Sequence, residues 1–435
     1  MDFITYIQQK MTAYLPEVIK GYNGEVTAAS LGEMEVAVKE MTHELGNEIL
    51  REWAEAQEEK YPAERRTCPC GENAKYIRRR RGMVITLQGR LNYRRAYYLC
   101  ERCGKGHYPL DEQLGIEPGQ MSREVVKLAA LCGIQDAFEA GSDLLARTTL
   151  LELSPNSIRK ACQVVGEHII TQERLALERS QDLAAQLEQR RDLNKPVRLY
   201  GSMDGFYILL ENGYREMKAG TWWTTRTRRD GEVEADQLQY YVDVLSAEAF
   251  ADLVWSSGFA CHADQALELV FIADGAEWIW RIVSRLYPHA IQIVDWYHAC
   301  TYLTTIAADA FSDPTQAQAW LAQQHTALWD GHLVTVFHAC RALFSQAPQA
   351  VRAALSYFAH NRARLRYAKF RALGLQIGSG SMESGCKQIG LERLKIAGAR
   401  WSEAGARNIA KARAAYLSGQ WDEVTAPAVV LTQVA

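Results

Sequence analysis

Three acidic residues lie where a carboxylate could do chemistry. Asp204 and Asp274 each end a short apolar run typical of a strand, and a glycine follows each of them. Glu383 comes just after a Gly/Ser-rich stretch at 378–381, where a helix is expected to begin. Converging carboxylates can hold two Mg²⁺ or Mn²⁺ ions for phosphodiester chemistry. We therefore take these acids as the candidate catalytic and metal-binding residues.

Each acid also has a simpler interpretation. Asp-Gly is common in turns, and a glutamate in the first turn of a helix interacts favourably with the helix dipole. Lys387 would share the helix face of Glu383, either as an ordinary ion pair or as a contact to a scissile phosphate. Asp295 and His298 would likewise share a face. They could form an auxiliary site or simply be a helix cap and a partly buried histidine.

The elements that must position these acids begin near residue 196. Strands are expected at 197–203, 206–211, 214–220, 239–245, 269–273 and 290–294, and helices at 247–267 and 276–286. That order predicts an α/β fold with a ribonuclease-H-like core. A long helical insertion would separate the last of these strands from the Glu383 helix.

Four cysteines form two pairs, each followed by glycine: Cys68 and Cys70, then Cys100 and Cys103. A hairpin between the pairs would bring four sulfurs to one tetrahedral, structural Zn²⁺. This favours a zinc ribbon over four free thiols in a small β module. The other six cysteines stand among apolar neighbours and are interpreted as buried thiols in a reducing compartment.

The net charge of −3 conceals a basic segment, because residues 65–105 contain 12 Lys and Arg and only two acids. Within it, Arg78, Arg79, Arg80 and Arg81 are candidate phosphate contacts; the alternative is a solvated basic face. Farther on, Ser154 and Pro155 are typical of a helix start. Arg159 and Lys160 would then begin a recognition helix, although a plain structural helix pair is an equally good interpretation.

These patterns predict the following regions: an N-terminal helical region (1–64), a zinc ribbon (65–112), a helical, helix-turn-helix-like DNA-binding region (113–193), the first part of the core (194–303), a helical insertion (304–370), the second part of the core with the Glu383 helix (371–420) and a tail (421–435). No apolar run reaches membrane-spanning length and the first residues lack a signal-peptide pattern. A cytoplasmic, nucleoid-associated location without membrane contact is expected.

The chain resembles bacterial insertion-sequence transposases of the DDE type, in particular the ISKra type, which is similar to Mutator-like transposases. The motifs that carry the resemblance are Cys68-Pro-Cys70-Gly, Cys100-x-x-Cys103-Gly, Tyr108-Pro-Leu-Asp, Ser202-Met-Asp204-Gly, Ile272-Ala-Asp274-Gly, Asp295-Trp-Tyr-His298, Gly378-Ser-Gly-Ser-Met-Glu383-Ser and Leu394-Lys-x-x-Gly-Ala-Arg-Trp401.

The resemblance implies a DNA transposase in which the three acids bind two Mg²⁺ ions. Water would nick DNA at the element end, and the freed 3′-OH would then attack target DNA. The ribbon and the helices at 134–165 would bind terminal inverted repeats, and a homodimer or larger assembly would join two ends. The alternatives are a domesticated zinc-ribbon DNA-binding regulator and a structure-specific nuclease on the same fold.

Overall fold

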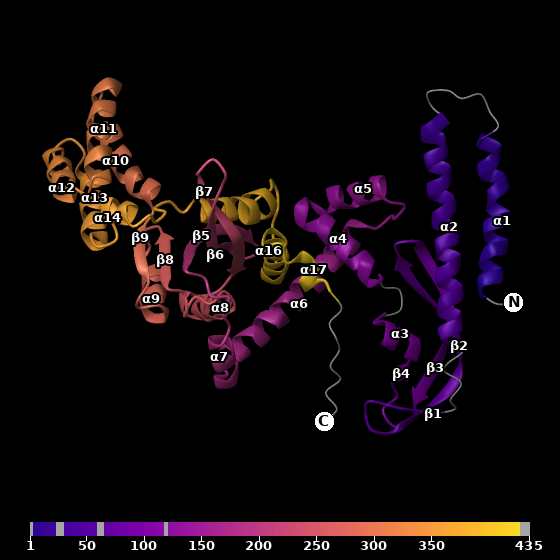
Figure 1. Ribbon diagram of the computed structural model, residues 1–435. Helices are drawn as coiled ribbons and strands as arrows, with labels where there is room; N and C mark the ends of the chain where they lie inside the picture. Colours follow the sequence, from indigo (N-terminus) through magenta and orange to yellow (C-terminus); the bar gives the residue numbers. More distant parts are fainter. Residues whose placement is uncertain (1–2, 23–29, 59–64, 117–120, 427–435) are drawn as a thin grey trace. The chain divides into compact units, whose positions relative to one another are not determined.

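The computed structural model describes residues 3–22, 30–58, 65–116 and 121–426. The chain divides into two compact units, Met1–Cys162 and Gln163–Ala435. Both mix helices with one sheet (Figure 1). Of the predicted tail at 421–435, residues 427–435 lie outside the described residues. In the described part of the chain, no helix combines the length and apolar character that crossing a membrane requires.

The first unit contains a four-stranded antiparallel sheet in the order β1-β2-β3-β4. Its elements are α1 (Phe3–Tyr22), α2 (Ser30–Glu58), β1 (Arg65–Thr67), β2 (Asn73–Thr86), β3 (Gly89–Cys100), β4 (Gly106–His107), α3 (Pro109–Leu114), α4 (Arg123–Gln135), α5 (Phe138–Thr148) and the first part of α6 (Pro155–Gln181). Helix α2 packs against this sheet through Ala54, which lies in a buried cluster with Val84, Leu91 and Tyr93. The cysteine pairs stand near the ends of the β2–β3 hairpin.

The second unit contains a five-stranded sheet in the order β7-β6-β5-β8-β9. Its elements are α7 (Leu183–Arg190), β5 (Arg198–Leu210), β6 (Gly213–Thr227), β7 (Val233–Asp243), α8 (Ala247–Ala260), β8 (Glu268–Ala273), α9 (Glu277–Leu286), β9 (Ile291–Val294), α10 (Trp296–Ala310), α11 (Pro314–Trp329), α12 (Leu333–Ala342), α13 (Pro348–Asn361), α14 (Tyr367–Ala372), α15 (Gly380–Cys386), a π-helical segment η1 (Lys387–Leu394), α16 (Glu403–Leu417) and α17 (Trp421–Val424).

The order of strands and helices in this unit agrees with the sequence, with one correction. The predicted strands 197–203 and 206–211 are a single strand, β5, so Asp204 lies inside a strand and not at the end of one as predicted. Gly205 does not interrupt it, because it pairs with Lys218 of β6 in an unbroken ladder. Strands β5, β6 and β7 are antiparallel, whereas β8 and β9 run parallel to β5.

Helices cover both faces of this sheet. Neighbouring residues of a strand point to opposite faces of the sheet. The contacts of Tyr240 and Tyr241 of β7 therefore identify the helix that covers each face. Tyr241 packs against Phe250 of α8, with ring centroids 5.7 Å apart. The Tyr240 hydroxyl donates to the Ser381 carbonyl of α15, 3.2 Å away. Helix α8 and the helix that carries Glu383 therefore lie on opposite faces.

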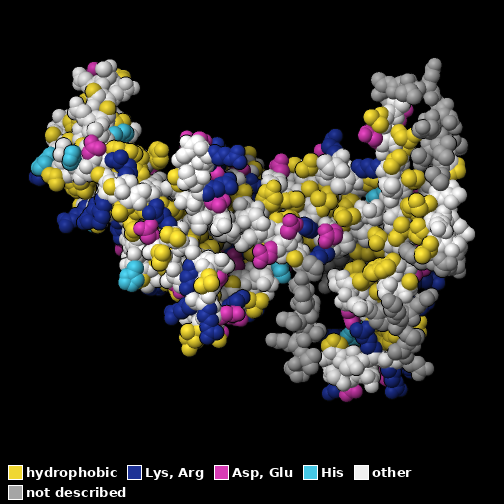
Figure 2. All heavy atoms as spheres, in the orientation of Figure 1, with side chains coloured by type: hydrophobic (Ala, Val, Ile, Leu, Met, Phe, Trp, Pro, Cys, Tyr) yellow, Lys and Arg dark blue, Asp and Glu magenta, His cyan; other side chains and the backbone are white. Residues whose placement is uncertain are grey.

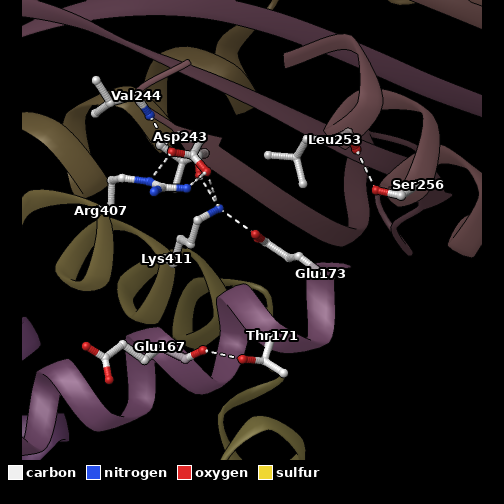
Figure 3. Close-up of polar contacts among 10 residues, drawn as sticks. Glu167, Thr171, Glu173, Asp243, Val244, Leu253, Ser256, Arg407 and Lys411 are labelled. Carbon is white, nitrogen blue, oxygen red and sulfur yellow. Dashed lines mark hydrogen bonds and ion pairs between the residues drawn. The ribbon is translucent and has the colours of Figure 1, made fainter. Parts of the chain in front are cut away.

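A buried ion cluster joins α16 and α6 to the end of β7 (Figure 3). Arg407 donates to both oxygens of Asp243 at 2.6 and 2.9 Å. Lys411, whose side chain is 1% exposed, lies 2.9 Å from Asp243 and 2.5 Å from Glu173. A buried charge is tolerated when it is paired and hydrogen-bonded, so these contacts fix α16 against the sheet.

We predict that Asp243→Asn lowers the free energy of unfolding by about 3–5 kcal/mol, because breaking a buried ion pair leaves a buried charge uncompensated. Urea denaturation at neutral pH measures this. The matched control is Asp252→Asn, the same change at an exposed position of α8, which should leave stability unchanged. Equal stability of the two variants would contradict a stabilising role for the cluster.

The stability difference between wild type and Asp243→Asn should depend on pH. Burial acts to raise the pKa of Asp243, but the hydrogen bonds from Arg407 and the charge of Lys411 outweigh it and hold the pKa below 3.8. A lowered carboxyl pKa stabilises the folded state above the ordinary value, and the contribution is lost as pH falls through the folded-state pKa. The stability gap between wild type and Asp243→Asn should therefore be full at neutral pH and shrink below pH 3.8.

Candidate functional site

The register of the parallel strands places two of the candidate acids side by side. Gly201 of β5 pairs with Phe271 of β8. Asp204 and Asp274 each lie three residues farther along, so the same register continued brings them to one level at the carboxyl edge of β8. The negative charge of Asp274 indeed acts on Asp204. The sequence therefore provides two neighbouring carboxylates from strands that are far apart along the chain.

Asp204 lies in a half-buried setting beside a thiol. Burial raises its pKa above the usual range, and the charge of Asp274 raises it further. The Gly205 amide donates to one carboxylate oxygen at 2.7 Å, and the Cys386 thiol lies 3.6 Å from the other. Both contacts lower the pKa. Two carboxylates this close repel each other, and a bound cation would relieve that repulsion.

The predicted helix start at the Gly/Ser stretch is confirmed as α15, and Glu383 lies in its first turn, exposed. Helix α15 packs across β5, β6 and β7. Its Cys386 contacts Asp204, and the charge of Glu383 raises the pKa of that thiol after burial and Asp204. The charges of Glu383 and Asp204 both act on Cys386, and that of Asp274 acts on Asp204, so all three candidate acids lie in one region of the second unit.

The carboxylate oxygens of the three acids do not all lie within 4.8 Å of one another. Among the residues that the structure describes, only one group of three or more His, Cys, Asp or Glu ligand atoms lies within 4.8 Å of one another, and it is the cysteine cluster.

Asp295 has a different role from the three acids. Ala273 of β8 pairs with Val294 of β9, so Asp295 comes level with Asp274, yet it is 6% exposed and both its oxygens are occupied. One oxygen accepts from the His298 amide at 2.7 Å, as the N-cap of α10. The other accepts from the Ser379 amide at 2.6 Å and the Ser379 hydroxyl at 2.9 Å. Asp295 therefore ties the end of β9 to the start of the Glu383 helix.

His298 lies in an aromatic group next to Asp274. Its ring centroid is 6.0 Å from those of Tyr302 and Tyr357, which are stacked on each other at 4.0 Å. Burial raises the pKa of both tyrosines, and the charge of Asp274 adds to it. A positive charge on His298 would lower the pKa of Asp204. His298 is thus close enough to the acids to influence them.

Lys387 does not continue the helix of Glu383. Helix α15 ends at Cys386, and Lys387 opens the π-helical segment η1. The wider turn alters the i,i+4 geometry that the sequence suggested. No ion pair between Glu383 and Lys387 occurs among the described side chains, and Lys387 is exposed.

The four cysteines form the second candidate centre, and they could bind a zinc ion. The Cys68 and Cys103 sulfurs are 3.6 Å apart, as are those of Cys70 and Cys100. Sulfurs at 2.3 Å from one tetrahedral Zn²⁺ would lie about 3.8 Å apart. Both pairs belong to tight turns that need glycine, since Gly71 and Gly104 have φ of 86° and 68°.

Sequence analysis missed one residue of this centre. His107 of β4 places its Nε2 atom 3.2 Å from the Cys68 sulfur, while its Nδ1 atom lies 3.2 Å from Glu112. Such outer contacts orient metal ligands. The available signal was its position four residues after Cys103, within the same glycine-rich turn region.

The side chains predicted to contact DNA differ in their solvent exposure and packing. Arg78, Arg79 and Arg81 are exposed on β2. Arg80 is instead packed 3.7 Å from the centre of the Tyr97 ring, so its role is at least partly structural. The predicted helix start at Ser154 is confirmed, because its hydroxyl accepts from the Ser157 amide at 3.1 Å. Arg159 and Lys160 are exposed in the first turns of α6.

We predict one zinc ion per chain in protein purified without chelator, measured by elemental analysis. Cys100→Ser should remove it and unfold the β1–β4 sheet, because a structural zinc site stabilises its fold directly. Cys261→Ser, outside the cluster, is the control and should keep the zinc. Zinc-free wild-type protein with an intact sheet would refute the site.

We further predict that Asp295→Ala lowers the free energy of unfolding by about 2–4 kcal/mol, because it removes the charged acceptor of buried donors. Ser379→Ala removes only one of these hydrogen bonds and should cost about 1 kcal/mol. Hydrogen exchange of the 378–386 backbone should speed up in Asp295→Ala. Unchanged exchange there would show that Asp295 does not hold the Glu383 helix.

Comparison with protein-family models matches residues 26–426 to the family described as "Uncharacterised protein family (UPF0236)". A search of curated proteins found no match.

Proposed function

The chain belongs to the family UPF0236, since the match covers residues 26–426, and from this premise we propose that it is a DDE-type DNA transposase. The family is associated with transposase-like proteins. The finer assignment to the ISKra type, similar to Mutator-like transposases, rests on the sequence motifs and is part of the proposal. The proposed reaction is cleavage of DNA at the element ends and joining of the 3′ ends to target DNA.

One observation supports the proposal: Asp204, Asp274 and Glu383 lie in one region of the second unit although they stand far apart in sequence. Two come from adjacent parallel strands and the third from a helix that packs on the same sheet. The strand order β7-β6-β5-β8-β9, with β7 to β5 antiparallel and β8 and β9 parallel to β5, is the order expected for a ribonuclease-H-like core. The helices α10 to α14 stand where a helical insertion is expected.

The residues suit a hard divalent cation. Mg²⁺ and Mn²⁺ bind carboxylate oxygen and retain several waters, so they need few protein ligands and tolerate open sites. The raised pKa of Asp204 reflects burial and the neighbouring Asp274 charge, and a bound cation would relieve both. When bound, two such ions activate the attacking oxygen and stabilise charge on the leaving oxygen.

The chain's own residues would orient the reacting groups. In cleavage, a water oxygen bonds to phosphorus as the P–O3′ bond breaks, leaving a 3′-OH and a 5′-phosphate. In joining, that 3′-OH attacks a phosphodiester of target DNA and displaces a new 3′-OH. Asp204, Asp274 and Glu383 would hold the ions, while Asp295 keeps the Glu383 helix in place. His298 is close enough to take part in proton movement at this edge.

The first unit would supply DNA binding. The cysteine ribbon with Arg78, Arg79 and Arg81, and the start of α6 with Arg159 and Lys160, are basic surfaces suited to phosphate contacts. Double-stranded DNA of element ends and target is the proposed partner. A homodimer or larger assembly is proposed because two element ends must be joined.

We predict that Asp274→Asn lowers the rate of Mg²⁺-dependent cleavage of a labelled element end by at least about 10³-fold, which corresponds to about 4 kcal/mol of activation free energy. The variant keeps the shape of the side chain and removes one ligand charge. Asp204→Asn and Glu383→Gln should behave alike, and binding to the same DNA should persist. Asp252→Asn is the control for the substitution itself and should cleave normally.

The outcomes separate the candidate functions. Near wild-type cleavage by all three variants would refute the carboxylate assignment. Loss of binding together with cleavage would make the acids structural. DNA binding by wild-type protein without any cleavage would favour a regulator that uses only its DNA-binding region, and cleavage without strand transfer would favour a structure-specific nuclease.

A further inference from the structure

The helical insertion has an uneven distribution of charge. Residues 331–377 contain no Asp or Glu, and their Lys and Arg residues are Arg341, Arg352, Arg362, Arg364, Arg366, Lys369 and Arg371. Five of these fall within residues 361–372, in the turn between α13 and α14 and in α14 itself. In Figure 2, Lys and Arg side chains gather at the end of the unit where these two helices lie. Such a charge distribution is typical of a surface that binds a polyanion.

Two of the five basic residues are already used by the fold. The Arg364 guanidinium donates to Gln292 at 2.8 Å and lies 4.5 Å from the centre of the Trp280 ring. Arg371 lies 3.8 Å from the centre of the Trp329 ring and donates to the Trp329 carbonyl at 2.9 Å. These two residues therefore help to build the surface.

The remaining three, Arg362, Arg366 and Lys369, are exposed. None of them forms an ion pair with a carboxylate of the described residues. Other exposed arginines of this unit do form such pairs: Arg174 with Glu178, Arg179 with Glu188 and Arg281 with Glu277. The three insertion residues thus keep their full charge available to a partner.

The segment is anchored to the edge that carries the acids. The Val294 amide at the end of β9 donates to the Arg364 carbonyl at 3.1 Å. The Tyr367 hydroxyl, next to Arg366, donates to the Val294 carbonyl at 3.1 Å. Val294 directly precedes Asp295, which is level with Asp274. The three basic residues therefore belong to a segment fixed directly against the strand end next to the candidate acids.

We propose that Arg362, Arg366 and Lys369 form a second DNA-binding surface, which holds the phosphate backbone of the duplex on which the acids act. The proposal rests on the proposed function, because a polyanion bound beside a phosphodiester-cleaving site is most simply the substrate itself. Long flexible cations without carboxylate partners suit contacts to phosphate rather than to base edges. This surface belongs to the second unit and is separate from the ribbon and the start of α6.

The test is a triple variant, Arg362→Ala with Arg366→Ala and Lys369→Ala, in the full-length protein. Each lost phosphate contact reduces the slope of log affinity against log salt concentration by about 0.9 on duplex DNA, so the slope should fall by up to about 2.7. The probe is a duplex of arbitrary sequence, measured by fluorescence anisotropy at several salt concentrations. The control replaces Arg174, Arg179 and Arg281 with Ala, the same loss of charge at carboxylate-paired sites, and should change the slope little.

Each outcome bears on one claim. A reduced slope in the triple variant alone, with an unchanged melting temperature, supports the surface. Wild-type and triple-variant slopes that are equal overturn it and leave the transposase proposal intact. Equal losses in both triple variants would show a general charge effect and would also overturn it. Wild-type protein that binds no DNA would instead refute the proposed function. A triple variant that binds an acidic protein more weakly but DNA equally would identify a protein partner and overturn the DNA assignment.

Discussion

The carboxylate of Asp295 connects the parts on which the candidate site depends. One oxygen caps α10, the first helix of the insertion, and the other holds the backbone and hydroxyl of Ser379 before the Glu383 helix. The Asp295 amide in turn donates to the Ala273 carbonyl at the end of β8, 2.8 Å away. One buried, fully hydrogen-bonded charge therefore joins two strand ends, the insertion and the helix of the third acid. Such a group is costly to bury unless every contact is made, which makes the arrangement specific.

Around this fixed point, the acids themselves are held less tightly. Asp204 is half-buried next to a thiol, Asp274 also caps the turn into α9 through the Ala276 amide at 2.8 Å, and Glu383 is exposed. The backbone of the candidate site is thus held through Asp295, whereas the three acids differ in burial and in their own contacts.

Much of this could be predicted from sequence, because it depends on local patterns. The apolar run before Asp274 located the end of β8, the Gly/Ser stretch located the start of α15, and paired cysteines with glycine located the cysteine cluster. The run before Asp204 did not locate a strand end, because β5 continues through it. What could not be predicted depends on tertiary contacts. The role of Asp295 required knowledge that Ser379 lies beside it, and the contact of His107 with Cys68 required the β3–β4 pairing. The continuity of β5 through Gly205 depended on its partner strand, and the π-helical turn after Cys386 altered the position of Lys387. The acid-free stretch at 331–377 was visible in the sequence, but only the structure showed which of its cations are unpaired.

The glycine that follows Asp274 illustrates how a sequence motif can mislead about its cause. Asp-Gly suggests a turn, yet Gly275 does not adopt the left-handed backbone conformation that favours glycine. A Cβ atom at this position would lie 2.1 Å from the Tyr357 ring of α13. The Tyr357 ring occupies the space that a side chain at residue 275 would fill. A side chain at 275 would overlap the Tyr357 ring, so that ring would have to shift. Gly275 therefore allows the Tyr357 ring of α13 to lie directly beside the end of β8, next to Asp274.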